Sequence, residues 1–554
     1  MPVPSKSVPR AARAAGGVLL VGAALASTSP VRVAAAEPDP DGGCVDVAAD
    51  VGLDFRGAYG TTMIPTPMGA MMQRNMGNGA AVGDYDADGD LDVFLLGQAG
   101  QPDALYRNDL VPGGDLRFTD VTAAAGVGDP WLSRVAHLAD LDGDGWLDLL
   151  VVNDTLEDGS RGTSMLYRNR RDGTFEDVTQ GSGFAPSGFI VGGASLADVE
   201  GDGDLDVFLT YWTEELGGDP ALRDSRGTYP AQNLLYRNDG GFQFTDVSRE
   251  SGLGGIRRDS FSSVFADFDG DVDLDLYVAV DHREDLYYEQ VAPMRFVDRS
   301  ATVGVVHKGN DMGVAVADLA SDGALDVFVT NITDPTGEIG TGSGNVLWRA
   351  EGTGDSLRFV NRAAELGVDD TAWGWGTAWL DIDLDGDLDL YAVQGMDEYV
   401  TMTSLPLRDA TARLFLADGD ALTLAQGTGC DIPGDQRSLV AFDADRDGDL
   451  DLLVTQVAFH ARLLENRMAR GGSITVDLAA GGAAAPGARV SVTAGDRTTT
   501  QVVLAGGSYL AGPPMEVVAG VGDALVADVL VRWADGRETL LEGVPAGARV
   551  APVP

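Results

Sequence analysis

The chain has 554 residues, of which 74 are glycine, and its formal net charge at pH 7 is −48. A chain of this length exceeds one ordinary hydrophobic core, so we expect several domains or a repeat architecture. The hydrophobic content of 44% argues against wholesale disorder, and the negative charge argues against binding to nucleic acid or to anionic membranes.

The N-terminus has the composition of an export signal. Basic residues precede an apolar run, Ala14–Ala26, and small residues follow it, with Ala34–Ala36 as the favoured cleavage site. The run is too short for a permanent anchor, and no later stretch reaches membrane length. We therefore predict a signal peptide at 1–36 and a linker at 37–43; an unstructured N-terminus is the alternative. The mature chain is then periplasmic, secreted or on the cell surface, without an integral membrane segment.

An acidic loop of nine residues recurs seven times at intervals of 51 to 69 residues. We number the copies 1 to 7 in chain order; they are 84–92, 140–148, 198–206, 267–275, 318–326, 381–389 and 443–451. Positions one, five and nine are Asp in every copy, and position eight is Leu in every copy. Position six is Gly except for Val272, and position three is Asp except for Glu200 and Ala320. Such a period indicates a repeat architecture.

Three further segments repeat with the loop. A short apolar run follows it, as at Val93–Leu96, and suits a strand covered on both faces. A Leu-Tyr-Arg-Asn tag comes next, first at Leu105–Asn108, and a Phe-to-Gly tag, first at Phe118–Gly126, precedes the following loop. About four strands in roughly 60 residues match one blade of a β-propeller.

The order of these segments predicts a closed ring. Cys44–Ala48 is a copy of the Phe-to-Gly tag with no loop before it. A chain that opens with the last strand of a blade can complete its final blade after Asp451, which leaves no open sheet edge. We therefore predict an all-β fold with a seven-bladed propeller at 44–470; an open stack of repeats is the alternative.

The acidic loops predict calcium sites. Clustered carboxylates repel one another, and Ca²⁺ relieves this repulsion by accepting about six to eight oxygens in flexible geometry. Positions one, three, five and nine offer side chains, position seven offers its backbone carbonyl, and Gly at position six lets the backbone reverse. Zinc is disfavoured because no loop contains His or Cys. Solvated acidic turns without metal are the alternative.

The predicted metal residues are those at the odd-numbered positions of each loop. They are Asp84, Asp86, Asp88, Asp90 and Asp92; Asp140, Asp142, Asp144, Trp146 and Asp148; Asp198, Glu200, Asp202, Asp204 and Asp206; Asp267, Asp269, Asp271, Asp273 and Asp275; Asp318, Asp322, Ala324 and Asp326; Asp381, Asp383, Asp385, Asp387 and Asp389; and Asp443, Asp445, Asp447, Asp449 and Asp451. We thus expect up to seven Ca²⁺ sites. Glu200 distorts the third and Val272 the fourth, and the site at 318–326 is weak or empty because Ala320 supplies no ligand.

With these loops, 44–470 resembles the FG-GAP/VCBS-like repeat proteins, which share calcium loops with the integrin α-chain propeller. The resemblance implies a seven-bladed propeller with each metal loop in a hairpin between neighbouring strands of a blade.

The remaining residues, 471–554, resemble the ASPIC/UnbV domain. The matching residues are Gly487–Val490, Gly507–Tyr509, Gly520–Gly522 and Val531–Gly536, although Ala534 and Asp535 depart from the family pattern. The combination is that of the cartilage acidic protein family, which implies extracellular calcium binding and contact with protein or matrix. The residues themselves predict a small β-sandwich, since stretches such as Val526–Trp533 have the residue alternation of β-strands.

Other residues give weaker signals. Cys44 and Cys430 occupy tag positions whose segments meet where the ring closes, so a disulfide and two free buried thiols both remain open. Trp373, Trp375 and Trp379 either pack inside a blade or form a platform for a sugar or partner. His137 either lines the central tunnel or acts as a general base. No Gly-x-Ser-x-Gly elbow or phosphate-binding glycine loop occurs.

These observations favour an exported, calcium-loaded binding or adhesion module that is monomeric and recognises an extracellular protein or glycan. No catalytic constellation is recognisable in the sequence, so we do not expect an enzyme. An extracytoplasmic enzyme acting on polysaccharide, such as a lyase, and a structural surface component are the alternatives.

Overall fold

The computed structural model describes residues 42–57, 75–98, 101–128, 131–154, 163–186, 190–213, 232–254, 258–334, 336–337, 342–396, 410–468 and 471–554. All of them belong to one compact unit, Ala35–Pro554. The predicted signal peptide at 1–36 and most of the linker at 37–43 lie outside the described residues. No helix among the described residues is long and apolar enough to cross a membrane.

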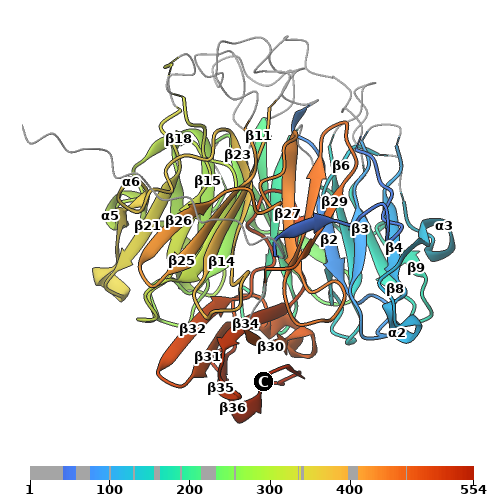
Figure 1. Ribbon diagram of the computed structural model, residues 1–554. Coiled ribbons are helices and arrows are strands. Elements are labelled where there is room, and N and C mark those ends of the chain that lie inside the picture. The colour runs from blue at the N-terminus through green and yellow to red at the C-terminus, as the bar shows by residue number, and fades with distance from the viewer. Residues whose placement is uncertain are drawn as a thin grey trace, which may run out of the picture. The chain divides into compact units, whose positions relative to one another are not determined.

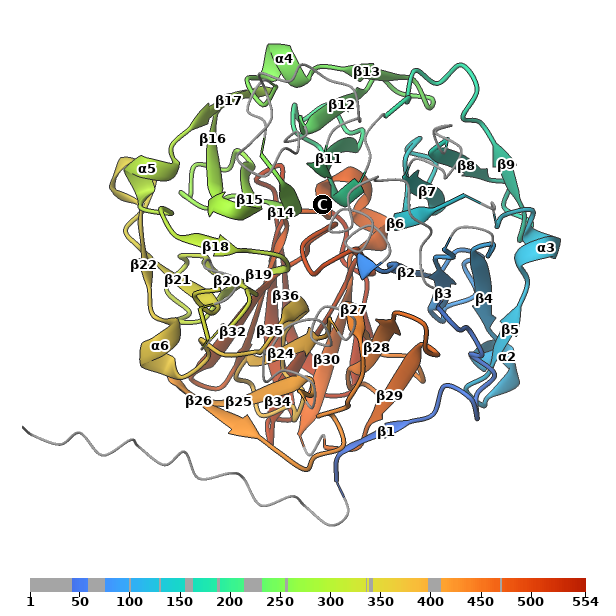
Figure 2. The same ribbon diagram turned by 90° about the horizontal axis from the view of Figure 1, so that it is seen from above.

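Seven antiparallel sheets follow one another around a ring and form the blades of a β-propeller (Figure 2). In each blade an acidic loop joins the first two strands. Blade 1 contains β2 (Ala80–Gly83), β3 (Asp92–Leu95), β4 (Ala104–Asn108) and β5 (Phe118–Asp120), and blade 2 contains β6 (Ser133–Ala139), β7 (Asp148–Asn153), β8 (Met165–Asn169) and β9 (Phe175–Asp177). Blade 3 contains β10 (Ile190–Ala197), β11 (Asp206–Thr213), β12 (Leu234–Asn238) and β13 (Phe244–Asp246).

The other four blades repeat this order. Blade 4 contains β14 (Ser260–Ala266), β15 (Asp275–Glu284), β16 (Leu286–Ala292) and β17 (Arg295–Asp298), and β18 (Lys308–Asn310) also pairs with β15. Blade 5 contains β19 (Val314–Asp318), β20 (Asp326–Val329), β21 (Val346–Glu351) and β22 (Arg358–Asn361). Blade 6 contains β23 (Gly374–Leu380), β24 (Asp389–Gln394), β25 (Arg413–Asp418) and β26 (Ala421–Ala425), and blade 7 contains β27 (Gln436–Phe442), β28 (Asp451–Gln456), β29 (Arg462–Asn466) and β1 (Cys44–Asp46).

The N-terminal strand closes the ring, as the sequence predicted. β1 pairs antiparallel with β29, with Cys44 opposite Asn466, so blade 7 takes its outer strand from the start of the chain. A disulfide joins Cys44 to Cys430, which lies just after the outer strand of blade 6, and their Cα atoms are 4.9 Å apart. The chain ends of the ring are therefore held by one β-ladder and one covalent bond.

The repeated tags have distinct structural roles. The apolar run after each loop is the second strand, and every residue of β3 and β7 is buried, as expected for a strand covered on both faces. The Phe-to-Gly tag forms the outer strand and the turn after it. In four blades that turn is one turn of helix, namely α3 (Thr122–Ala125), α4 (Ser248–Ser251), α5 (Ser300–Val303) and α6 (Ala363–Leu366); α2 (Leu110–Gly113) lies in blade 1 between β4 and β5.

An amide side chain at the end of the Leu-Tyr-Arg-Asn tag ties each of five blades to the blade before it. It donates to the carbonyl at position two of the preceding blade's acidic loop. The bonds run from Asn108 to Ala444 (2.9 Å), Asn169 to Tyr85 (2.7 Å), Asn238 to Leu141 (2.9 Å), Gln290 to Val199 (3.0 Å) and Asn466 to Ile382 (2.8 Å). Blades 5 and 6 carry Ala350 and Ala417 at this position, so they lack the tie.

The C-terminal region, residues 471–554, forms two small sheets that pack on each other. One is three-stranded, with β30 (Gly472–Asp477), β34 (Glu516–Gly522) and β37 (Ala548–Val550); the other contains β31 (Arg489–Ala494), β32 (Arg497–Val502), β35 (Val526–Arg532) and β36 (Glu538–Pro545). Their shared core includes Ile474, Val490, Val529 and Trp533. β32 also pairs with β19, so the second sheet continues into blade 5 (Figure 1).

Residues 503–514, which we call the plug segment, fill the centre of the ring. The backbone of the plug segment and its Ser508 side chain contact the first strands of blades 1, 3, 4, 6 and 7. β33 (Ala511–Gly512) pairs with β2, Ala505 bridges to Leu196 of β10, and Gly507 donates to Ser263 of β14 at 2.9 Å. Ser508 accepts from Thr377 of β23 at 3.1 Å and donates to Leu439 of β27 at 3.0 Å. The tunnel of this propeller is therefore occupied by the chain itself.

The plug segment is anchored by Tyr509, which is fully buried. Its ring centroid lies 4.7 Å from that of Trp375 and 5.7 Å from that of Phe261, and its hydroxyl donates to the Met76 carbonyl at 3.1 Å. The Arg437 guanidinium stacks over Trp375 at 4.6 Å. Trp373 and Trp375 are buried and Trp379 is half-buried, so two of the three tryptophans pack inside the protein, as the packing alternative predicted.

Replacing Tyr509 tests whether the plug segment stabilises the ring. We expect Tyr509→Ala to lower the free energy of unfolding by about 3–5 kcal/mol, because it leaves a cavity among large aromatic side chains. Leu525→Ala is the control, since Leu525 is 84% exposed and its loss should leave the melting temperature nearly unchanged. Thermal unfolding followed by circular dichroism measures both. Equal melting curves for the two variants would show that the plug segment contributes little.

Candidate metal centres

The seven acidic loops share one backbone conformation. Position six has a φ between +83° and +104° in every copy, which glycine adopts without strain. Val272 holds position six of loop 4 at +83°, a strained conformation for a β-branched residue. Position four is also left-handed in every copy, even where it is Leu384 or Arg446. The sequence analysis missed position four, although glycines at 143, 201 and 270 were a signal for it.

The three invariant aspartates hold this conformation. The position-one carboxylate accepts backbone N–H groups from across the loop, as Asp84 does from Asp88 (3.1 Å) and Gly89 (3.0 Å). The position-five carboxylate accepts the N–H of position seven in all seven loops. Aspartate at positions one and five is therefore explained by backbone hydrogen bonding, in addition to any role of these carboxylates as metal ligands.

The position-nine carboxylate joins strands of the blade. One oxygen accepts the N–H of the last residue of the Leu-Tyr-Arg-Asn tag in all seven blades, at 2.7–2.9 Å. The other oxygen accepts the N–H of position two in six loops, whereas in loop 4 it accepts the Tyr287 hydroxyl at 2.7 Å. Position three takes no part in these bonds, and it varies among the copies, with Glu200 in loop 3 and Ala320 in loop 5.

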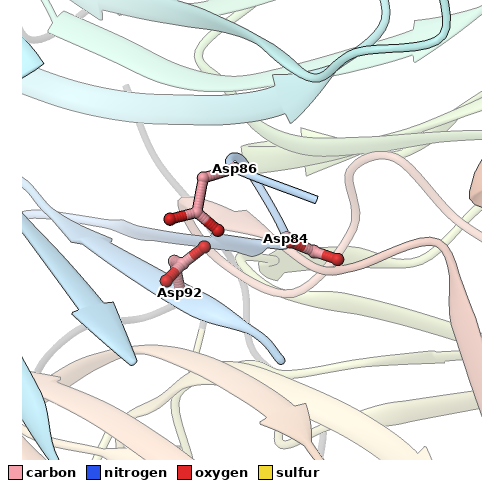
Figure 3. A group of neighbouring side chains, drawn as sticks. All are labelled: Asp84, Asp86 and Asp92. Carbon is pink, nitrogen blue, oxygen red and sulfur yellow. The ribbon is translucent and has the colours of Figure 1, made fainter. Parts of the chain in front are cut away.

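Carboxylates gather closely in five loops. In loops 1 and 2, oxygens of positions one, three and nine lie within 4.8 Å of one another, and in loops 4, 6 and 7 those of positions one, three and five do. Figure 3 shows the first of these groups, Asp84, Asp86 and Asp92, at the end of its hairpin. Loops 3 and 5, which lie wholly within the described residues, contribute no such group.

Loops 1, 2, 6 and 7 also contain buried carboxylate oxygens that accept no hydrogen bond, whereas loop 4, which has all five aspartates and is described in full, contributes none. These oxygens are on Asp86 and Asp90, Asp142, Asp381 and Asp383, and Asp443 and Asp449, and loop 3 adds one on Glu200. Burial, with repulsion from neighbouring carboxylates, raises the pKa of Asp84 to about 6, of Asp381 to about 7 and of Asp449 to about 8. A divalent cation bound to these oxygens supplies the missing partner and removes the repulsion, so the residues present fit a hard cation such as Ca²⁺.

Loops 3, 4 and 5 depart from this pattern, and each has a guanidinium nearby. In loop 5, which lacks a position-three ligand, Arg349 contacts Asp326 at 3.0 Å. Arg489 of the C-terminal region lies 3.6 Å from Asp267 of loop 4 and donates to Gly323 of loop 5 at 2.6 Å. Arg237 lies 3.7 Å from Glu200 of loop 3. Such contacts are not confined to these loops, since Arg171 contacts Asp144 of loop 2 at 2.5 Å. The missing carboxylate at position 320 is what favours our prediction that the site at 318–326 is weak or empty.

The recurring arginines of the Leu-Tyr-Arg-Asn tag pair with acidic side chains. Arg107 contacts Asp109 at 2.6 Å, Arg168 contacts Asp142 at 2.7 Å, and Arg237 contacts Asp239 at 2.5 Å. These pairs give the recurring arginines a structural role in their blades. His137 is buried, its Nε2 lies 3.2 Å from the Ala194 carbonyl, and burial lowers its pKa to about 4, so it is a packed core histidine.

The C-terminal region is bonded to loops 4 to 7. Beyond the Arg489 contacts, Thr499 donates to the Gly386 carbonyl, and Gly520 N–H donates to the Asp381 carboxylate at 2.9 Å. Ser473 donates to the Gly448 carbonyl at 2.5 Å. Arg446 of loop 7 donates to both carboxylate oxygens of Glu516, each at 3.0 Å. The C-terminal region therefore contacts the same backbone that shapes the metal centres, which the sequence analysis did not foresee.

Comparison with protein families identifies both parts of the chain. Residues 84–151, 140–209 and 267–329 match the FG-GAP-like repeat, and residues 465–551 match ASPIC and UnbV. The chain therefore contains FG-GAP-like repeats followed by an ASPIC/UnbV region, as the sequence motifs indicated. FG-GAP-like repeats often bind calcium.

Curated relatives include cartilage acidic protein 1 of Homo sapiens, 28% identical over 173 residues, which are 31% of this chain and 23% of the relative. Cartilage acidic protein 1 of Mus musculus is 30% identical over 137 residues, which are 24% of this chain and 21% of the relative. The chain thus spans less than a quarter of the length of these relatives. Repeats and relatives of this kind are typical of extracellular proteins.

Solved structures resemble the chain only weakly. The rhamnogalacturonan lyase YesW has a TM-score of 0.33 at 12% identity, over 89% of this chain and 92% of that one. The V. cholerae biofilm matrix protein Bap1 has a TM-score of 0.29 at 11% identity, over 91% of this chain and 63% of that one.

Removing calcium tests the metal centres together. We expect excess EDTA to lower the melting temperature steeply, because a site held at about 100 times its dissociation constant contributes about 2.7 kcal/mol. Differential scanning calorimetry with calcium and with EDTA measures the effect. Identical melting curves under the two conditions would contradict calcium binding.

A single variant tests one centre. Asp86 contributes an unpartnered buried oxygen to loop 1, so Asp86→Asn should lower the bound calcium by about one equivalent and lower the melting temperature. Asp115→Asn removes an exposed carboxylate outside the loops and is the matched control. Elemental analysis after gel filtration in calcium buffer counts the metal. Unchanged calcium content in the Asp86 variant would exclude loop 1 as a site.

Val272→Gly tests whether loop 4 is held in a strained state. Glycine adopts the φ of +83° freely, so the change should stabilise the calcium-bound protein by about 1 kcal/mol. Val272→Ala keeps a Cβ at the same φ and should give no such gain. Calcium-dependent melting compares the three proteins. A loss of stability in the glycine variant would show that the contacts of the Val272 side chain outweigh the strain.

Proposed function

We propose that this chain is an exported, calcium-binding propeller that acts as a binding or adhesion module for an extracellular protein or glycan. The observation that carries the proposal is the position of the C-terminal region. It is hydrogen-bonded to loops 4 to 7, and its plug segment contacts the first strands around the tunnel. Calcium then has a structural role, and a ligand has to be recognised by the opposite face of the ring.

The opposite face of blade 4 offers a basic group in an otherwise acidic protein. Arg258, Arg283 and Lys308 lie at the ends of strands there, with Arg258 and Lys308 each 3.4 Å from Glu284. Arg283 is exposed, and the Lys308 side chain is 65% exposed. An acidic partner, such as an acidic glycan or an acidic protein segment, would be attracted here while the rest of the surface repels it.

A glycan array and a pull-down from extracellular material test the proposal with the full chain in calcium. We expect retention of an acidic partner that is lost in EDTA and lost in the double variant Arg283→Glu/Lys308→Glu. Arg532→Glu changes an exposed arginine of the C-terminal region and should leave binding unchanged. Binding that survives the double variant, or calcium-dependent release of unsaturated sugars from acidic polysaccharide, would contradict a binding module of this kind.

A further inference from the structure

Three polar side chains from separate segments meet at the edge of blades 4 and 5. His307 precedes β18, Asp311 follows it, and Ser343 lies shortly before β21. The Ser343 hydroxyl lies 2.9 Å from His307 Nε2, and His307 Nδ1 lies 3.5 Å from an Asp311 carboxylate oxygen. This is the order of contacts found in nucleophilic serine sites, where apo geometry is commonly looser than in the reacting complex.

The Asp311 carboxyl group is fixed in a position from which it can orient the His307 ring. Its side chain is fully buried, and one oxygen accepts Asn331 Nδ2 at 2.7 Å. The other oxygen accepts no protein hydrogen bond and faces His307 Nδ1. An imidazole that donates from Nδ1 to Asp311 and accepts at Nε2 from Ser343 would give this buried oxygen its missing hydrogen bond. A ring rotation that shortens the 3.5 Å contact gives His307 the tautomer with a proton on Nδ1 and a free lone pair on Nε2.

A second buried carboxyl group lies beside this pair. Asp285 is fully buried and close enough to hydrogen-bond Asp311, and burial raises the pKa of both carboxyl groups well above the usual range. A proton shared between the two groups removes the repulsion between them. Burial lowers the pKa of His307, with the Asp285 charge opposing the shift. A neutral imidazole is the form that can accept a proton from serine.

Local glycines make the arrangement possible. A Cβ on Gly309 would lie 2.8 Å from both the free Asp311 oxygen and His307 Cε1, so only glycine lets these two side chains approach. Ser343 is exposed and stands between Gly342 and Gly344, and Gly344 has a φ of +84°. The turn thus presents the hydroxyl to solvent beside the histidine. The His307 side chain is 18% exposed, so a small molecule reaches the pair directly from the surface.

We propose that Ser343, His307 and Asp311 form a nucleophilic site that hydrolyses small, activated carboxylic esters. The Ser343 oxygen attacks the ester carbonyl while its proton passes to His307 Nε2. The C–O bond to the leaving alcohol breaks, and His307 returns the proton to that alcohol, which leaves Ser343 acylated. Water then attacks the acyl group and gives a proton to His307. The bond between the acyl carbon and the Ser343 oxygen breaks, and His307 returns the proton to that oxygen, which releases the carboxylic acid and the free serine. The site lies outside the acidic loops and does not require the proposed binding role, although it adjoins Lys308, whose backbone carbonyl accepts from the Ser343 hydroxyl at 3.3 Å.

A fluorophosphonate probe and p-nitrophenyl acetate test the site on the full chain in calcium buffer. We expect one label per chain, located on Ser343 by peptide mass spectrometry. Ester hydrolysis should rise with pH to a plateau as His307 loses its proton. Ser343→Ala should abolish the label, and His307→Asn should lower the hydrolysis rate by about 100-fold or more. Ser356→Ala, which removes an exposed serine bonded to the Thr353 backbone, should change neither.

A merely structural role predicts a different pattern. If Ser343 only caps the His307 ring, the wild-type protein takes up no probe while keeping its native circular dichroism and melting temperature, and the proposal is overturned. Labelling that is equal in wild-type and Ser343→Ala protein, or that is unaffected by His307→Asn in a folded variant, also overturns it. Asp311→Asn adds a readout of orientation, since it should slow hydrolysis while leaving Ser343 in place.

Discussion

The fold depends on keeping clustered carboxylates together in a compact ring. Loops such as 84–92 and 443–451 place several aspartates within a few ångströms. Loss of hydration on burial, together with repulsion from neighbouring carboxylates, raises the pKa of the innermost ones. Two devices counter this repulsion. Backbone N–H groups donate to positions one, five and nine, and a divalent cation fits the oxygens that remain without donors. Loop 5 keeps the backbone hydrogen bonds although Ala320 supplies no carboxylate, which shows that the loop conformation and the ligand set are separable properties.

The same loops support the rest of the architecture. Position two of a loop receives the amide of the next blade in five junctions, so loop conformation and blade packing are coupled. At the two junctions that lack this amide, blades 5 and 6 present Ala350 and Ala417, and the C-terminal region pairs with β19 of blade 5 instead. Arg489 lies between loops 4 and 5 and contacts both of them. The C-terminal region therefore takes part in the electrostatics of the ring.

Much of the fold and part of the candidate site could be predicted from the chain alone. The ring closure by Cys44–Asp46 followed from a tag that had no loop before it, and the buried second strands followed from continuous apolar runs. The seven loop boundaries agree with seven hairpins because each loop carries its own aspartates and its own glycine. The plug segment was not predictable, since Ala505–Gly512 has the composition of an ordinary turn and its partners lie in strands hundreds of residues away. The meeting of Ser343 with His307 was hidden for the same reason, because it depends on how β18 and β21 are placed.

Repetition explains the difference between these two groups of features. The sequence itself determines the features that it repeats seven times within loops of nine residues: the loop conformation, its set of acidic side chains, the strand order and the number of blades. Features that occur once and join distant segments were decided only by the tertiary structure: the filled tunnel, the seat of the C-terminal region on loops 4 to 7, and the Ser343, His307 and Asp311 group. The physical reason is that local hydrogen bonds and charge repulsion act between residues that are close in the chain, whereas these contacts arise only after the ring has brought separate blades together.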